Sequence, residues 1–254
     1  QQRTVAKMWR SVSGLTFQPV VDGGVIPAPP LERIRAGCAA GISLLVGSNR
    51  DEYKLWHLAD TKARELDQAA LLRRCQHNIP GESRDGISNA ARAIETYRRA
   101  REGRASVDPP ELWTAIETDR LFRAPAVRLA ECQRQHEGQT YTYLFDWTSP
   151  AMEGVLGSCH ALEIPFVFGT LHQPGISAFV GAGPLAERLS SVMQAAWLAF
   201  AHTGDPSHPE LGEWLPYDPE ARPTQLLGAR CELVNAPLEK ERQFWDDPPA
   251  LPPH

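Results

Sequence analysis

The chain has 254 residues, of which 42% are apolar and 22% charged, and its formal net charge is -5 at pH 7. This is the composition of an ordinary globular protein, and the length suffices for one large domain or two small ones. Acidic and basic residues are interspersed without a basic stripe, and no apolar run approaches the ~20 residues of a membrane-spanning helix, so neither nucleic acid nor a membrane is an expected partner.

The chain begins Gln1-Gln2-Arg3, with neither an initiator methionine nor an apolar secretion signal. We therefore expect either that a segment was removed or that the chain starts inside a longer protein. The five cysteines are odd in number and none of them forms a CxxC pair, which argues against a closed disulfide framework and a structural zinc site. A reducing compartment, and so a cytoplasmic location, is the simpler expectation, although the start of the chain leaves secretion open.

Three short apolar runs predict buried strands, at Ile42–Val46, Thr140–Phe145 and Cys231–Val234. Gly41 and Gly47 bound the first run, as turn-forming residues bound a short strand. The second run is aromatic and β-branched, which favours a strand over a helix.

Longer helical segments are predicted between these runs, over Asp67–His77, Arg84–Arg101 and Glu111–Gln135. Pro125 starts a second helix within the last segment, because a proline fits the first turn of a helix and disfavours the helical conformation just before it. Strands that alternate with long helices indicate an α/β fold of packed layers. Three strands are few for a self-contained sheet of this kind, so partner strands are expected elsewhere.

The strongest helical periodicity predicts a helix over Pro184–His202 that ends at Gly204. Its apolar stripe consists of Leu185, Leu189, Val192, Met193, Ala196, Trp197 and Phe200. The segment Asp205–Pro223 is rich in turn-forming and acidic residues and is predicted to be irregular surface. The tail Asp246–His254 contains four prolines and is predicted to fray.

Two acidic residues, Asp51 and Glu52, follow the first predicted strand after a turn-forming run. The carboxyl ends of strands are where α/β sheets place functional groups, so either carboxylate is a candidate for chemistry. The alternative is a solvated helix start, in which Asp51 caps a free backbone N–H group.

A histidine, His160, lies in a loop that contains Gly157 and Ser158, just ahead of an apolar run. This placement suits a catalytic base, because imidazole titrates near neutral pH and a packed segment anchors it. The alternative is an ordinary histidine of the surface or core. The adjacent Cys159 raises a cysteine nucleophile as a further option, although neighbouring side chains usually point in different directions.

Taken in order, these segments resemble the C-terminal half of the type-B carboxylesterases, the family of the bacterial para-nitrobenzyl esterases and the cholinesterases. The motifs that carry the resemblance are FQPVVDG from residue 17, GSNRDE from 47, Asp119 with Phe122 and Pro125, YTYLFDW from 141, HALEIPFVFG from 160, WLAFAHTGDP from 197, and Phe244-Trp245. Their order, from about Phe17 to Trp245, makes the resemblance specific.

The resemblance implies that residues 1–254 form the C-terminal portion of a single α/β-hydrolase domain, with a mostly parallel sheet flanked by helices. It implies a serine carboxylesterase that needs no cofactor or metal, in which Glu52 matches the triad acid and His160 the triad base. Asp51 is a weaker match for the acid. The family usually has glycine after the acid, and this chain has Tyr53, which alters the turn but leaves the carboxylate.

Further residues match family positions outside the triad. Asp119 and Glu163 match buried residues with structural roles. Leu15, Leu55 and Trp56 match positions that line the acyl pocket or substrate gorge, which suits an uncharged, small-molecule ester with an apolar group. Core packing is the alternative role for the last two.

The chain contains no G-x-S-x-G nucleophile elbow and no His-Gly-Gly run for an oxyanion hole. In the family both lie in the N-terminal half, so the resemblance implies that this half is a partner and that the isolated chain is inactive. The alternative function is a non-catalytic binding or adhesion protein, because the same fold also serves proteins that have lost catalysis.

Overall fold

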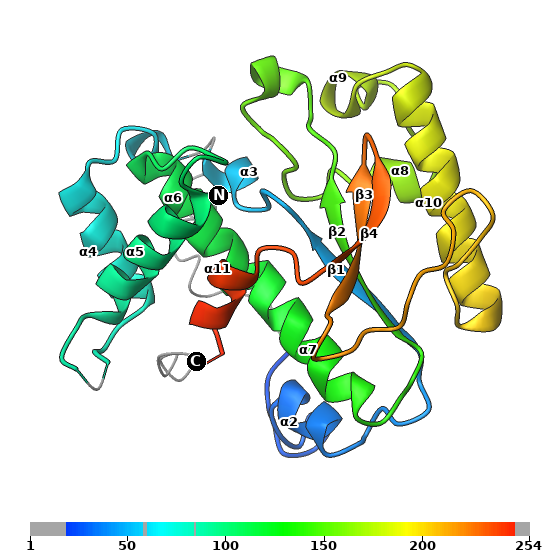
Figure 1. Cartoon of the computed structure of the whole chain (residues 1–254), viewed down its shortest axis with the longest axis horizontal. Helices are drawn as coiled ribbons and strands as arrows, with labels where there is room; N and C mark the ends of the chain where they lie inside the picture. The colour runs from blue at the N-terminus through cyan, green and yellow to red at the C-terminus, as the bar shows by residue number, and fades with distance from the viewer. Residues whose placement is uncertain (1–18, 58–59, 84, 247–254) are drawn as a thin grey trace.

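The computed structural model describes residues 19–57, 60–83 and 85–246 (Figure 1). Its strands form one sheet in the order β1 (Leu44–Asn49), β2 (Thr140–Asp146), β3 (Pro223–Gly228) and β4 (Cys231–Asn235). The first three are parallel and β4 runs antiparallel to β3. Asn49 lies opposite Phe145 in the register, so the loops that follow β1 and β2 leave the sheet at the same edge.

The three predicted strands are all present, and the expected α/β class is confirmed. The first strand lies about two residues further along than predicted, because Ile42 is 61% exposed and precedes the strand. Strand β3 was not predicted, because its Thr224 and Gln225 are polar and interrupt the apolar run, although both residues are buried. Within the described part of the chain, β1 pairs with β2 alone, which leaves its other edge without a strand.

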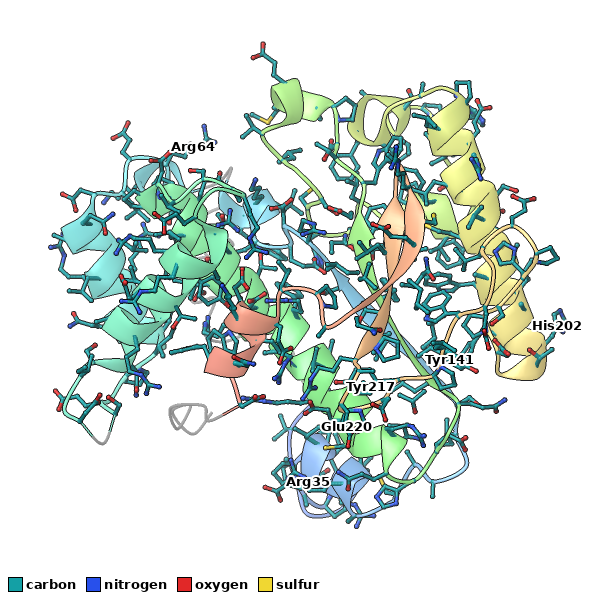
Figure 2. All side chains as sticks on the ribbon, viewed as in Figure 1. Arg35, Arg64, Tyr141, His202, Tyr217 and Glu220 are labelled. Atoms are coloured by element: carbon teal, nitrogen blue, oxygen red, sulfur yellow. The ribbon has the colours of Figure 1, made fainter. Side chains whose placement is uncertain are left out.

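Alternate residues of the strands face two different helical layers. Tyr141 and Phe145 of β2 face α10 (Pro184–Thr203), and Thr142 and Leu144 face α7 (Ala124–Arg134). Figure 2 shows Tyr141 between the sheet and α10, where its ring meets Phe200. The short helices α8 (Ile164–Val167) and α9 (Ser177–Val180) lie on the α10 side, and α2 (Pro30–Arg35) packs on α7 (Figure 1).

Helix α10 matches the predicted helix to within one residue, and Gly204 ends it in the left-handed conformation with φ of 78°. Leu189, Val192, Met193 and Ala196 are buried as expected. The prediction was wrong for Leu185, which is 59% exposed. None of the helices in the described residues is both long and apolar enough to cross a membrane.

Three helices form a lobe beside the sheet with a core of its own: α4 (Gln68–Asn78), α5 (Asn89–Arg101) and α6 (Pro109–Thr118). Asp67 caps α4 by accepting a hydrogen bond from Ala70 N–H. Helix α5 begins later than predicted, because the Ser83 N–H donates to the Ile87 carbonyl oxygen and closes a turn before it. The chain enters this lobe through α3 (Lys54–His57) and a 3-10 turn at Thr61–Ala63.

A π-helical turn, Asp119–Arg123, joins α6 to α7, with Pro125 in the first turn of α7. Asp119 is buried, as expected, and accepts hydrogen bonds from the Tyr97 hydroxyl and the Arg123 guanidinium. The Trp245 indole N–H donates to the same Tyr97 oxygen at 2.8 Å. These contacts tie the end of the described chain, after α11 (Glu239–Phe244), to the helical lobe.

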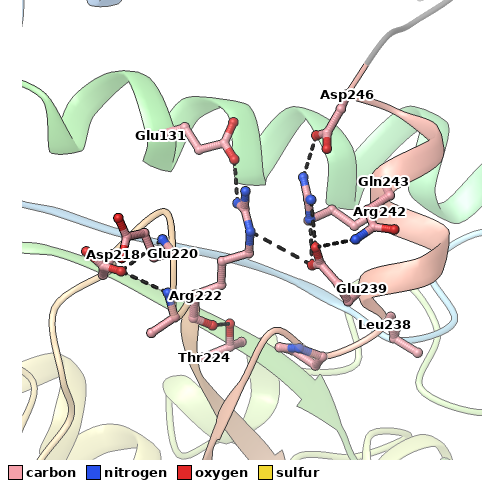
Figure 3. Close-up of polar contacts among 12 residues, drawn as sticks. Glu131, Asp218, Glu220, Arg222, Thr224, Leu238, Glu239, Arg242, Gln243 and Asp246 are labelled. Atoms are coloured by element: carbon pink, nitrogen blue, oxygen red, sulfur yellow. Dashed lines mark hydrogen bonds and ion pairs between the residues drawn. The ribbon is translucent and has the colours of Figure 1, made fainter.

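Ion pairs fasten α11 to the sheet and to α7 (Figure 3). Arg222, just before β3, contacts Glu131 of α7 at 2.6 Å and Glu239 of α11 at 3.9 Å. Arg242 pairs with Glu239 at 2.7 Å and with Asp246. The chain is therefore held to the fold as far as Asp246, and the remainder of the predicted frayed tail lies outside the described residues.

Candidate active site

Glu52 lies just beyond the carboxyl end of β1, in the turn that leads to α3. Its side chain is buried, at 8% exposure, and Oε1 accepts a hydrogen bond from the Asn49 N–H at 2.8 Å. One carboxylate oxygen is thereby held by the backbone of the strand. The other oxygen, Oε2, contacts a residue from another part of the chain.

That partner is His160, which lies in the loop between β2 and α8. Its Nδ1 atom lies 2.7 Å from Glu52 Oε2, and its backbone N–H donates to the Glu52 carbonyl oxygen at 3.3 Å. The imidazole is 42% exposed, and no described residue forms a hydrogen bond with Nε2. The structure thus joins an acid and a histidine that are 108 residues apart in sequence.

The two loops that carry these residues are also linked by Asp51 and Ser158. The Asp51 N–H donates to the Ser158 carbonyl oxygen at 2.9 Å, and the Ser158 N–H donates to Asp51 Oδ2 at 2.9 Å. Gly157 has φ of 54° and leaves no room for a side chain, because a Cβ atom there would collide with the Asp51 carboxylate. Asp51 therefore ties the loops together, and its carboxylate also pairs with Lys54 Nζ at 3.5 Å. Among the described residues, the Asp51 carboxylate forms no hydrogen bond with His160 or with a helix backbone N–H.

Electrostatics favour a basic imidazole at this position. The hydrogen bond that His160 donates to the Glu52 carboxylate raises the pKa of His160 above its ordinary value, against the opposing effect of partial burial, and the negative charges of Glu52 and Glu163 add to the increase. When Nδ1–H is donated to Glu52, the lone pair of Nε2 points away from the acid and can accept a proton. The arrangement is that of a general base with its orienting carboxylate.

Cys159, the alternative nucleophile, has no access to a substrate. Its side chain is 0% exposed and packs in the core beneath α8 and α10. Burial raises the pKa of its thiol to about 11, so the reactive thiolate is scarce at neutral pH. The option of a cysteine nucleophile is therefore contradicted by its burial.

Trp56 and Phe122 pack beside the His160 ring. The ring centres lie 4.8 Å and 5.2 Å from the imidazole, and the two aromatic rings stack on one another at 5.6 Å. Leu55, by contrast, packs against the core under the sheet, which is the alternative role considered for it. Leu15 lies outside the described residues.

Phe122 was expected only as part of a family motif, and its place at the site was not predicted. Its position there depends on the π-helical turn, which shifts the residues after Asp119 relative to a regular helix. Glu163 is half-buried, and burial raises the pKa of its carboxyl. It accepts a hydrogen bond from the Asn49 side chain, which supports the structural role expected of it.

Comparisons with known proteins show which proteins the chain is similar to. The model of the carboxylesterase family matches residues 2–245. The chain is 34% identical to the para-nitrobenzyl esterase of Bacillus subtilis (strain 168) over 231 residues, which is 90% of this chain and 43% of that protein. It is 32% identical to the phenmedipham hydrolase of Pseudarthrobacter oxydans over 205 residues, which is 79% of this chain and 38% of that protein.

Solved structures show the same partial match. A carboxylesterase of Geobacillus stearothermophilus, at pH 6.2, superimposes with a TM-score of 0.79 and 33% identity over 95% of this chain and 48% of that one. A para-nitrobenzyl esterase superimposes with a TM-score of 0.71 and 29% identity over 100% of this chain and 47% of that one. The chain thus spans less than half the length of the relatives it matches.

Proposed function

Because the chain belongs to the carboxylesterase family, we propose that it supplies the acid and the base of a Ser-Glu-His triad, Glu52 and His160, to a carboxylic ester hydrolase. The observation that carries the proposal is the 2.7 Å contact between Glu52 Oε2 and His160 Nδ1. A buried carboxylate that orients an accessible imidazole is the arrangement that a serine nucleophile needs.

The proposed reaction proceeds by two proton transfers through His160. Its Nε2 accepts the proton of the serine hydroxyl as Oγ bonds to the ester carbonyl carbon. The same proton then passes to the leaving alcohol as the ester C–O bond breaks. Water repeats these steps on the acyl-serine, which releases the carboxylic acid and restores the serine. Glu52 stays ionised throughout and stabilises the imidazolium that forms.

The serine and the oxyanion hole belong, in this proposal, to an N-terminal half of the same domain. Two observations support it: the relatives are more than twice as long as the matched segment, and β1 has an edge that no described strand pairs. Residues 1–254 are then the C-terminal portion of a single α/β-hydrolase domain. An open strand edge invites pairing or aggregation, so the chain alone is expected to be inactive and poorly behaved.

The proposed substrate is a small, uncharged ester. Trp56 and Phe122 support this class, because their apolar aromatic rings pack beside the His160 imidazole. Leu15 and Leu55 remain proposed contacts of the acyl pocket or gorge. A carbamate, thioester or amide uses the same triad chemistry and stays open as the bond that is cleaved. The unpaired state of all five cysteines supports a reducing, cytoplasmic location.

The test is hydrolysis of p-nitrophenyl acetate by the complete protein, in which the preceding half is present, and by residues 1–254 alone. The proposal predicts saturable turnover by the complete protein and none by the chain. Turnover by the chain alone would contradict the assignment of the serine to the other half. An inactive complete protein would favour the alternative, a non-catalytic binding protein on the same fold.

A further inference from the structure

We propose that Asn49 is a positioning residue, which holds Glu52 and His160 in register through its backbone N–H and its side-chain amide. The inference rests on the proposed function of these two residues. Asn49 is the last residue of β1 and is 1% exposed. It is neither the proposed acid nor the proposed base, yet its hydrogen bonds reach both of the loops that carry Glu52 and His160.

The backbone of Asn49 fixes the acid. Its N–H donates to Glu52 Oε1 at 2.8 Å, so the carboxylate is held at one oxygen by the strand and at the other by His160. Asn49 also lies opposite Phe145 in the sheet, and the Phe145 carbonyl oxygen accepts the Ser158 hydroxyl at 2.8 Å. The acid and the histidine loop are therefore both anchored to the same rigid sheet, the acid through β1 and the loop through β2.

The side chain of Asn49 fixes the base. Its Nδ2 atom donates to the Cys159 carbonyl oxygen at 2.8 Å and also to Glu163 Oε2. These acceptors lie one residue before and three residues after His160. Between them, Ala161 has φ of 65°, a left-handed conformation that is unfavourable for alanine and persists only where neighbouring contacts impose it. The amide of Asn49 holds this strained segment from both sides.

Only an amide of this size can make both bonds. The Cys159 carbonyl and the Glu163 carboxylate are acceptors, so the group between them must supply two hydrogens. Aspartate has the same shape and no hydrogens to donate when ionised. The Asn49→Asp substitution therefore turns two attractions into two repulsions while it leaves the backbone N–H in place.

The experiment compares Asn49→Asp, Asn49→Asp/Glu163→Gln and the control Asn235→Asp in the complete protein. Asn235 is exposed at the end of β4, far from the site in the register of the sheet. We expect kcat for p-nitrophenyl acetate to fall about 100-fold in Asn49→Asp with KM within about threefold, because misplacement of the base by ~1 Å costs about this much. The control is expected to match the wild type.

The double variant is expected to recover about tenfold in kcat over Asn49→Asp, because the new amide at position 163 donates to the new carboxylate at position 49. The single variant adds a negative charge near His160, which favours the imidazolium, so the acid limb of kcat/KM moves to higher pH. The double variant restores the net charge and returns the limb toward its original position. A residue that only stabilised the fold would leave kcat of the folded Asn49→Asp variant near the wild-type value, so the double variant would have no loss to recover.

Values of kcat within threefold of the wild type in Asn49→Asp, or no recovery in the double variant, would overturn the inference. Thermal unfolding shows whether each variant folds. If Asn49→Asp does not fold, Asn49→Ser replaces it, since a hydroxyl donates one hydrogen and can hold only one acceptor. A loss of kcat of about tenfold then supports the inference, and wild-type kcat contradicts it. The His160→Ala variant distinguishes failure of the inference about Asn49 from failure of the proposed function. If His160→Ala retains turnover, the proposed function itself has failed.

Discussion

The carboxylate of Asp51 occupies the space that a side chain on Gly157 would need. Because residue 157 also has φ of 54°, only glycine fits both the conformation and the contact. This close approach lets the Ser158 N–H reach Asp51 at 2.9 Å and brings the loop of His160 against the loop of Glu52.

The first prediction follows from that contact. The Gly157→Ala substitution should push the two loops apart and lower the free energy of unfolding by about 1–3 kcal/mol, through the left-handed φ and the collision. It should also lower kcat, since the Glu52–His160 distance depends on the same loops. Denaturant unfolding and steady-state kinetics of the complete protein measure both, and Gly154→Ala is the control, because a Cβ atom there meets no neighbour although φ is 86°. Equal behaviour of the two variants would contradict the role given to the contact.

The second prediction concerns pH. Glu52 raises the pKa of His160, so kcat/KM in the complete protein should rise with pH through a value above the ordinary one for histidine. The Glu52→Gln substitution removes that carboxylate, and the acid limb should move to lower pH while kcat falls about 10³- to 10⁴-fold. Glu187→Gln, an exposed position on α10, should change neither. An acid limb that stays in place in Glu52→Gln would show that another group controls it.

The third prediction distinguishes the cysteines. Cys38 is exposed, whereas burial raises the pKa of Cys159 to about 11 and that of Cys75 to about 12. Iodoacetamide at pH 8 should therefore modify Cys38 well before the two buried thiols, as read by mass spectrometry of the peptides. Unfolding in denaturant should remove the difference. Rapid modification of Cys159 in the folded protein would reopen its role as a nucleophile.

The fourth prediction concerns the helical lobe. The Tyr97→Phe substitution removes a hydroxyl that donates to Asp119 and accepts from Trp245, and leaves both groups without that partner. The free energy of unfolding should fall by about 1–3 kcal/mol. Tyr141→Phe is the matched control, because no described residue forms a hydrogen bond with the Tyr141 hydroxyl. A similar loss in both variants would show that the buried network contributes no more than packing does.

Much of the fold could be predicted from local pattern. The periodicity of α10 and the apolar runs of β1, β2 and β4 predict their elements with small errors at the ends. Strand β3 was not predicted because Thr224 and Gln225 are polar. Their burial depends on hydrogen bonds and sheet pairing that cannot be inferred from local sequence. The same holds for α5, whose predicted start is replaced by a turn closed by Ser83 and Ile87.

The candidate site shows a different limit. Local pattern made Glu52 and His160 candidates, but only the resemblance to a family paired them, because no local pattern brings together residues 108 positions apart. Phe122 and Asn49 were missed for physical reasons. Phe122 reaches the imidazole only because of the π-helical turn. Asn49 ends a predicted strand, and nothing in the sequence indicates that its amide lies between Cys159 and Glu163.

The most direct test of the account compares His160→Ala with His202→Ala in the complete protein. His202 is exposed near the end of α10, on the far side of that helix from the sheet (Figure 2). The account predicts that kcat/KM for p-nitrophenyl acetate falls by about 10⁴-fold or more in His160→Ala, because the serine loses its base, and is unchanged in His202→Ala. Turnover of His160→Ala within tenfold of the wild type would contradict the assignment of the catalytic base.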